Sequence, residues 1–235
     1  MIAAGLLLVA VGAVDLLRQM LHTRRWIAYL VGAVLLVLAS AGLDAVVAGL
    51  LAVAVGAIWT WVVPDSGAAR AGLWPVALLA IAAAACVVLA PGRERPGLLG
   101  HVWQTYGPAH SVSVDVVVLV IGCLAFLMES GNAVVRIALR SEMGAQTDDE
   151  TSPPTLKGGR LIGPLERVLL FVLTLAGAYT LIAAVLAAKG IVRFPEISRD
   201  GDGGSRAEYF LIGSLVSWVT ALAAAFLVWW GAHAA

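Results

Sequence analysis

Four polar side chains recur along one apolar stretch at intervals that place them on a single face of a helix. Glu129, Asn132, Arg136 and Arg140 stand at i, i+3, i+7 and i+11, within about 80° of one another around an ideal helix. Glu129 lies deepest, about 10 Å along the axis from Arg136 at 1.5 Å per residue. A carboxylate in apolar surroundings needs a cation, a proton or a ligand. The spacing predicts a site at Glu129 and Asn132, or an ion pair that holds the helices together.

A second charged group opens a later apolar stretch. Pro164 and Glu166 suit the first turn of a helix, where a carboxylate complements the positive helix end. Glu166 is therefore either a helix-start carboxylate, paired with Arg167 or Arg136, or part of a cytoplasm-facing site. Converging arginines would make that site suitable for a phosphate or carboxylate group. These arginines are Arg136, Arg140, Arg160 and Arg167.

The composition requires membrane helices to position these side chains. Hydrophobic residues make up 61% of the chain and charged residues 13%, whereas soluble domains have about 45–50% and about 25%. The 15 basic and 15 acidic residues balance, which gives no reason to expect a nucleic-acid partner. Cys86 and Cys123 lie inside apolar runs and are interpreted as core residues. The histidines are too widely spaced to indicate a metal site, and no other cofactor is indicated.

Seven apolar stretches predict an all-α fold, a polytopic transmembrane helical bundle of about seven spans. Asp15, Asp44 and Asp115 fall near predicted span ends, where water can solvate them, so no role is assigned to them. If the sixth stretch is one helix, Glu166 and Lys189 are about 35 Å apart on opposite membrane faces. The stretches cover residues 2–17, 26–42, 43–63, 72–90, 112–138, 164–187 and 207–230.

The spans divide the chain into three parts. Residues 1–90 form a four-helix half, residues 91–110 an interfacial loop, and residues 111–235 a three-helix module that carries the charged site. Residues 4–13 are nearly repeated at 48–57, which indicates either two copies of one hairpin or a shared composition. The glycines that would form flat packing faces are Gly5, Gly12, Gly49 and Gly56.

The basic residues favour an amino terminus outside the membrane. In that orientation nine of the fifteen Lys and Arg residues fall on the cytoplasmic side of a seven-span bundle. The connection at 141–160 is then cytoplasmic. Ser152 and Ser205 are expected on opposite sides of the membrane.

Three blocks in the last third of the chain carry a resemblance. They read Gly-Arg-Leu-Ile-Gly-Pro-Leu-Glu-Arg at 159–167, Ala-Lys-Gly-Ile-Val-Arg-Phe at 188–194 and Ala-Glu-Tyr-Phe-Leu-Ile-Gly at 207–213. This pattern resembles a family of uncharacterised bacterial polytopic membrane proteins, and it implies a location in the bacterial cytoplasmic (inner) membrane but no reaction. Gly190 departs from the serine expected there, and residues 200–205 look like an insertion. The shared site that the resemblance implies comprises Arg160, Glu166, Arg167, Lys189, Arg193, Glu208 and Tyr209.

Three kinds of function stay open. The first is a transporter or channel for a small anionic solute. The sequence shows no catalytic nucleophile, metal site or phosphate-cradling motif, which favours transport over an enzymatic function. The second is a lipid-handling enzyme that binds an anionic head group and uses Glu129 or Glu166 as acid or base. The third is an accessory subunit whose charges pair with a membrane partner or with another copy of the chain.

Overall fold

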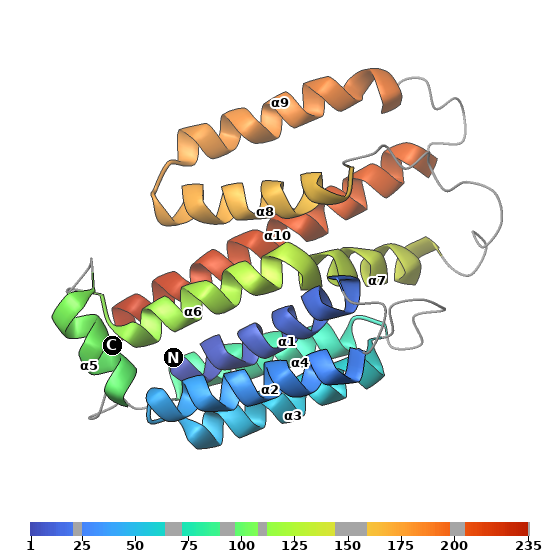
Figure 1. Ribbon diagram of the computed structural model, residues 1–235. Coiled ribbons are helices and arrows are strands. Elements are labelled where there is room, and N and C mark those ends of the chain that lie inside the picture. The colour runs from blue at the N-terminus through green and yellow to red at the C-terminus, as the bar shows by residue number, and fades with distance from the viewer. Residues whose placement is uncertain are drawn as a thin grey trace.

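The computed structural model describes residues 1–20, 25–63, 72–89, 97–107, 112–143, 159–197 and 205–234, and their regular elements are all helices. The all-α prediction is therefore confirmed for these residues. Figure 1 shows most of the helices running side by side along one direction. The helices are α1 (Ile2–Met20), α2 (Arg25–Gly42), α3 (Val46–Val62), α4 (Trp74–Val88), α5 (Gly97–Tyr106), α6 (Val114–Ala125), the π-helical turn η1 (Phe126–Ser130), α7 (Gly131–Met143), α8 (Gly159–Leu175), α9 (Tyr179–Ile197) and α10 (Ser205–Ala234).

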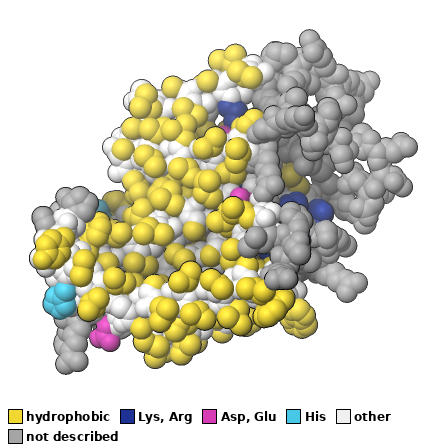
Figure 2. Space-filling view, in the orientation of Figure 1, with side chains coloured by type: hydrophobic (Ala, Val, Ile, Leu, Met, Phe, Trp, Pro, Cys, Tyr) yellow, Lys and Arg dark blue, Asp and Glu magenta, His cyan; other side chains and the backbone are white. Residues whose placement is uncertain are grey.

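Four helical segments are long and apolar enough to cross a membrane. They are Ile2–Met20, Arg25–Gly42, Val114–Ser141 and Phe210–His233, and shorter apolar helices lie at Val46–Val62, Trp74–Val88 and Tyr179–Val192. Figure 2 shows a face covered mainly by hydrophobic side chains, with few charged groups visible. Helix α2 buries only Ser40 within the protein. An apolar surface this extensive is unfavourable in water and suits contact with lipid.

Helix α1 packs closely against α6 through glycines. A Cβ atom added to Gly5 would lie 2.7 Å from the carbonyl carbon of Val118, and one added to Gly12 would lie 2.6 Å from that of Ala125. Gly122 of α6 approaches the Gly5 carbonyl oxygen in the same way. The two backbones could not approach so closely with larger residues. Gly5 and Gly12 are confirmed as a packing face, and their partner is α6.

The two hairpins of the suspected repeat pack differently. Helix α1 packs against α2, whereas α3 packs mainly against α1 and α2 rather than against α4. In the suspected repeat, Gly56 corresponds to Gly12. A Cβ atom added to Gly56 would make only ordinary van der Waals contacts with Ala10 and Val14, so Gly56 is less tightly packed than Gly12. Duplication of a hairpin stays a prediction.

The expectation of one helix over residues 164–187 is wrong. Helix α8 ends at Leu175, and Gly177 adopts the left-handed φ of +68°. The N–H of Gly177 donates to the Thr174 carbonyl at 3.1 Å, and that of Ala178 donates to the Leu173 carbonyl at 2.9 Å. This Schellman arrangement ends α8 and turns the chain into α9. The result is a helical hairpin in place of a single span.

The hairpin changes the topology of the bundle. Figure 1 shows both chain termini at one end, with α5 beside them, whereas α7 ends and α10 begins at the other end. An odd number of full crossings would separate the termini, so the seven-span count is not supported. Residue 152 lies outside the described residues, but the helix ends next to it and to Ser205 lie at the same end of the bundle.

Candidate functional site

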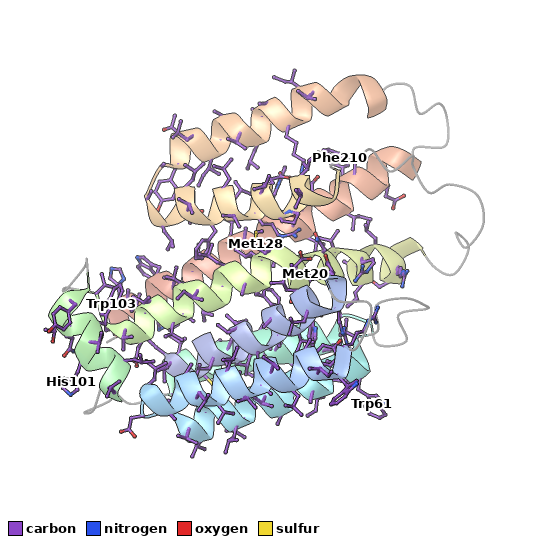
Figure 3. All side chains as sticks on the ribbon, in the orientation of Figure 1. Met20, Trp61, His101, Trp103, Met128 and Phe210 are labelled. Carbon is purple, nitrogen blue, oxygen red and sulfur yellow. The ribbon has the colours of Figure 1, made fainter. Side chains whose placement is uncertain are left out.

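Polar and charged side chains from seven helical elements meet inside the bundle, near the end where α1 and α3 terminate and α8 begins. We call this set the charged network. Figure 3 labels Met20 at the end of α1 and Met128 in η1, which are the sequence neighbours of Gln19 and Glu129. The network consists of Asp15, Arg18, Gln19, Trp59, Glu129, Ser130, Asn132, Glu166, Arg167, Lys189, Ser217 and Trp218.

Asp15 joins α1, α3 and η1. Its Oδ2 atom accepts hydrogen bonds from the Ser130 hydroxyl at 2.6 Å and from Trp59 Nε1 at 3.1 Å. Its Oδ1 atom accepts one from Arg18 Nη1 at 3.3 Å. The residue is only 6% exposed. The expectation that water solvates Asp15 is therefore wrong, because α3 and η1 cover this part of α1.

Arg18 is held by more than its carboxylate neighbour. It donates to the carbonyl of Val63 at 2.7 Å and to that of Thr60 at 2.5 Å, which lie at the end of α3. The last carbonyls of a helix have no partners within that helix, so a cation there meets unsatisfied acceptors at the negative helix end. Arg18 thus ties α1 to α3.

Arg167 of α8 crosses the surface of the π turn. Its Nε atom donates to the Leu127 carbonyl at 2.8 Å, its Nη2 to Asn132 Oδ1 at 2.6 Å and its Nη1 to Ser217 Oγ at 3.5 Å. A π turn interrupts the regular α-helical hydrogen bonds, which makes the Leu127 carbonyl available to a side chain. The guanidinium is buried, with 1% of the residue exposed.

Gly131 makes room for this guanidinium. A Cβ atom at Gly131 would lie 2.5 Å from Arg167 Nε, so any larger residue would displace the arginine. The π turn and Gly131 are adjacent in sequence and together accommodate Arg167. The π turn makes the Leu127 carbonyl available as an acceptor, and Gly131 leaves space for the guanidinium.

Glu129 lies in η1 and contacts α1. Gln19 Nε2 donates a hydrogen bond to Glu129 Oε2, and Arg167 attracts Glu129 electrostatically. Glu129 is half-buried, and the described hydrogen bond to its side chain comes from α1. Arg136 is exposed, so its predicted place beside Glu129 is wrong. A π turn has more residues per turn than an α-helix, so positions after it are rotated away from the face that ideal spacing predicts.

Glu166 and Lys189 form an ion pair between α8 and α9. Lys189 Nζ lies 2.7 Å from Glu166 Oε1 and 2.6 Å from Oε2, and Trp218 Nε1 of α10 donates to Oε1 at 2.7 Å. The ammonium lies 5.4 Å from the Trp218 ring centre and 5.5 Å from that of Phe210. The predicted separation on opposite membrane faces is wrong, because the turn at Gly177 folds α9 back along α8.

The sequence singled out five further residues besides Arg136. Arg140 and Glu208 are exposed. Pro164 lies inside α8, which begins at Gly159, so the first-turn position predicted for Pro164 and Glu166 is also wrong. The side chains of Arg160, Arg193 and Tyr209 lie outside the described part of the structure.

Sequence reasoning missed seven of the twelve residues of the network. The i, i+3 spacing of Asp15 and Arg18 is a local signal of an ion pair near a helix end. No local signal identifies Gln19, Trp59 or Trp218, because each acts through a partner that is distant in sequence.

No family model, curated protein or solved structure matches this chain. The resemblance of residues 159–213 to uncharacterised bacterial membrane proteins stays a prediction.

The charges in the network balance, with three carboxylates and three cations. Asp15 pairs with Arg18, and Glu166 pairs with Lys189. Arg167 differs, because its described hydrogen bonds all go to neutral acceptors: a backbone carbonyl, an amide and a hydroxyl. A buried cation held in this way retains the capacity to bind an anion.

Proposed function

We propose that this chain is an integral membrane transporter for a small anionic solute and that Arg167 binds the anion. The observation that supports this is the buried guanidinium of Arg167, whose described hydrogen-bond acceptors are all neutral. Hydrogen bonds between a guanidinium and an oxyanion are roughly twice as strong as those between neutral groups. An anion that reaches Arg167 can therefore displace its side-chain partners.

The two displaceable partners lie on different helices. Asn132 belongs to α7 and Ser217 to α10, whereas the Leu127 carbonyl belongs to the backbone of η1. We infer that the anion inserts between α7, α8 and α10, on the Nη1 and Nη2 side of the guanidinium. The planar fork of an arginine fits carboxylate and phosphate groups alike.

We propose eight membrane crossings with both termini outside. Helices α8 and α9 have 17 and 19 residues, which at 1.5 Å per residue gives about 25 Å and about 28 Å, close to the hydrocarbon thickness of a bilayer. In this topology thirteen of the fifteen Lys and Arg residues belong to the end where α1 terminates, and only Arg93 and Arg95 belong to the other end. This asymmetry supports the proposal that the first end faces the cytoplasm and that the protein lies in a bacterial inner membrane.

Cysteine labelling in intact cells tests the topology. In a background in which Cys86 and Cys123 are replaced by alanine, we expect Ser141→Cys and Glu208→Cys to resist an impermeant maleimide until the cells are opened. Thr180→Cys, next to the α8–α9 turn, should react from outside. Reaction of Ser141→Cys and Glu208→Cys from opposite sides would restore an odd number of crossings, and cytoplasmic reaction at Thr180→Cys would make the hairpin re-entrant.

Uptake into proteoliposomes tests the transport proposal. The probes are radiolabelled inorganic phosphate and succinate, one for each oxyanion class. We expect uptake of at least one probe above that of empty liposomes, and a loss of about tenfold or more in Arg167→Lys, which keeps the charge but loses the fork.

The matched control is Arg136→Lys, because Arg136 is exposed near the same end of the bundle. Its uptake should equal that of the unaltered protein. Failure of the folded protein to move either probe would refute the transport proposal. In that event, binding of the protein to phosphatidylglycerol vesicles would favour the lipid-handling enzyme. If the protein binds neither probe nor these vesicles, and substitutions in the charged network only destabilise it, the accessory subunit is favoured.

A further inference from the structure

Two glycines adjoin the guanidinium of Arg167, and they leave different amounts of space. A Cβ atom at Gly131 would lie 2.5 Å from Nε, which is closer than van der Waals contact allows. A Cβ atom at Gly163 would lie 3.5 Å from Nη1 and 3.6 Å from Asn132 Oδ1, which are ordinary contact distances. The Nε end of the guanidinium is therefore closed by Gly131, whereas the Nη1 end borders a space in which a methyl group fits.

The register of α8 explains why this space adjoins the guanidinium. Gly163 and Arg167 are four residues apart, so they lie on one face of α8. Side chains of a helix tilt toward its amino terminus, so that of Arg167 extends along α8 toward Gly163. Gly163 is half-buried, whereas Arg167 is 1% exposed. Any side chain at residue 163 would fill the space beside Nη1.

We propose that the oxyanion group of the solute binds in the space that Gly163 leaves beside Arg167, so that Gly163 is a residue of the anion-binding site. The inference rests on the proposed transport function and adds the place at which the anion binds. It also limits the solute to anions with a terminal carboxylate or phosphate group, because only an unsubstituted group presents its oxygens within so small a space.

The dimensions of an oxyanion match this space. An oxygen that accepts a hydrogen bond from Nη1 lies about 2.8 Å from that nitrogen. A C–O bond of about 1.23 Å then places the carboxylate carbon about 3.6 Å from the nitrogen. The missing Cβ atom of Gly163 lies at nearly the same distance, 3.5 Å. A methyl group at residue 163 therefore competes with the central atom of the bound oxyanion.

The two side-chain partners of Arg167 can turn to serve the bound anion. Asn132 presents its amide oxygen to Nη2 at 2.6 Å. The same amide carries two N–H donors, which face the anion once the group has rotated by half a turn. The Ser217 hydroxyl oxygen lies 3.5 Å from Nη1, a long hydrogen bond that an oxyanion readily replaces. The freed hydroxyl can then donate to the anion.

Replacement of Gly163 by alanine tests this site in proteoliposomes. The added methyl group makes only ordinary contacts with Arg167 and Asn132, and alanine favours a helix more than glycine does. The melting temperature in detergent should therefore be unchanged or higher. We expect the half-saturation concentration for radiolabelled phosphate or succinate, whichever is transported, to rise about tenfold or more, because the methyl group overfills the occupied site.

Gly213→Ala is the matched control. Gly213 is also a half-buried helical glycine, and a Cβ atom there would meet only the apolar side chains of Val135 and Leu139, at 3.7 and 3.8 Å. This variant gains the same preference for a helix without touching Arg167. Its half-saturation concentration should equal that of the unaltered protein.

The possible outcomes separate the site from the transport function. Normal half-saturation in Gly163→Ala, together with loss of uptake in Arg167→Lys, would refute binding beside Gly163 and leave anion transport intact. An equal rise in Gly213→Ala, or a fall in the melting temperature of Gly163→Ala, would trace the defect to helix packing and would also refute the site. Absence of uptake by the unaltered protein would refute transport and this inference together.

Discussion

Replacement of Arg167 by methionine should lower the stability of the protein by several kcal/mol, because each buried acceptor that loses its donor costs about 1–3 kcal/mol. The substitution leaves the Leu127 carbonyl and the Asn132 amide oxygen without their donor. It also removes the positive charge that attracts Glu129 and Glu166. Methionine has a similar length and is apolar, so the lost contacts are mainly polar. Thermal unfolding in detergent, followed by size-exclusion chromatography after heating, measures the effect.

Arg136→Met is the matched control for this experiment. Arg136 lies on the adjacent helix α7 and is exposed, so its replacement should change stability by less than about 0.5 kcal/mol. Equal melting temperatures for Arg167→Met and the unaltered protein would show that the guanidinium does not hold η1, α7 and α10 together. Anion transport should be lost in Arg167→Met in either case.

Replacement of Asp15 by alanine should have an effect of the same size. The change leaves Arg18 buried without its carboxylate and removes the acceptor of Trp59 Nε1 and of the Ser130 hydroxyl. Loss of one partner from a buried ion pair costs about 3–5 kcal/mol. The same heating assay should therefore show a large fall in melting temperature.

A double substitution separates the lost pair from other causes. Asp15→Ala combined with Arg18→Met removes both charges, and the combined cost should be smaller than the sum of the two single costs. Additive costs would indicate that Asp15 and Arg18 stabilise the fold independently. The stabilisation by Asp15 would then come from its hydrogen bonds with Trp59 and Ser130, and that by Arg18 from its hydrogen bonds to the α3 carbonyls.

The charged network joins α9, which makes few other contacts with the described elements, to the rest of the bundle. Among the described elements, α9 packs mainly against α8, and the Glu166–Lys189 pair with Trp218 ties this hairpin to α10. Asp15 and Arg18 add polar contacts between α1, α3 and η1, which also pack extensively against one another. A conformational change that alters one centre of the network can therefore reach helices on both sides of Arg167, as the transport function proposed above would require.

The sequence by itself determined the helical membrane character of the protein. Apolar runs of the required length and the spacing of charged residues within them are local properties, so they can be recognised without knowing which helices touch. The small-residue face of α1 was recognisable for the same reason, since Gly5 and Gly12 lie seven residues apart on one side of the helix. Glu129 and Asn132 stood out because a carboxylate and an amide are costly in lipid wherever they pack.

The tertiary structure alone decided which residues these groups meet. The turn at Gly177 is hidden within an apolar run, because Leu175, Ala176 and Ala178 are as apolar as the spans on either side. The π turn at η1 rotates Arg136 away from Glu129, and ideal helical spacing does not include such a turn. Asp15 and Gln19 gain their roles from partners more than forty residues away. Local sequence fixes which side chains a helix carries, whereas burial and pairing depend on the helices that pack around it.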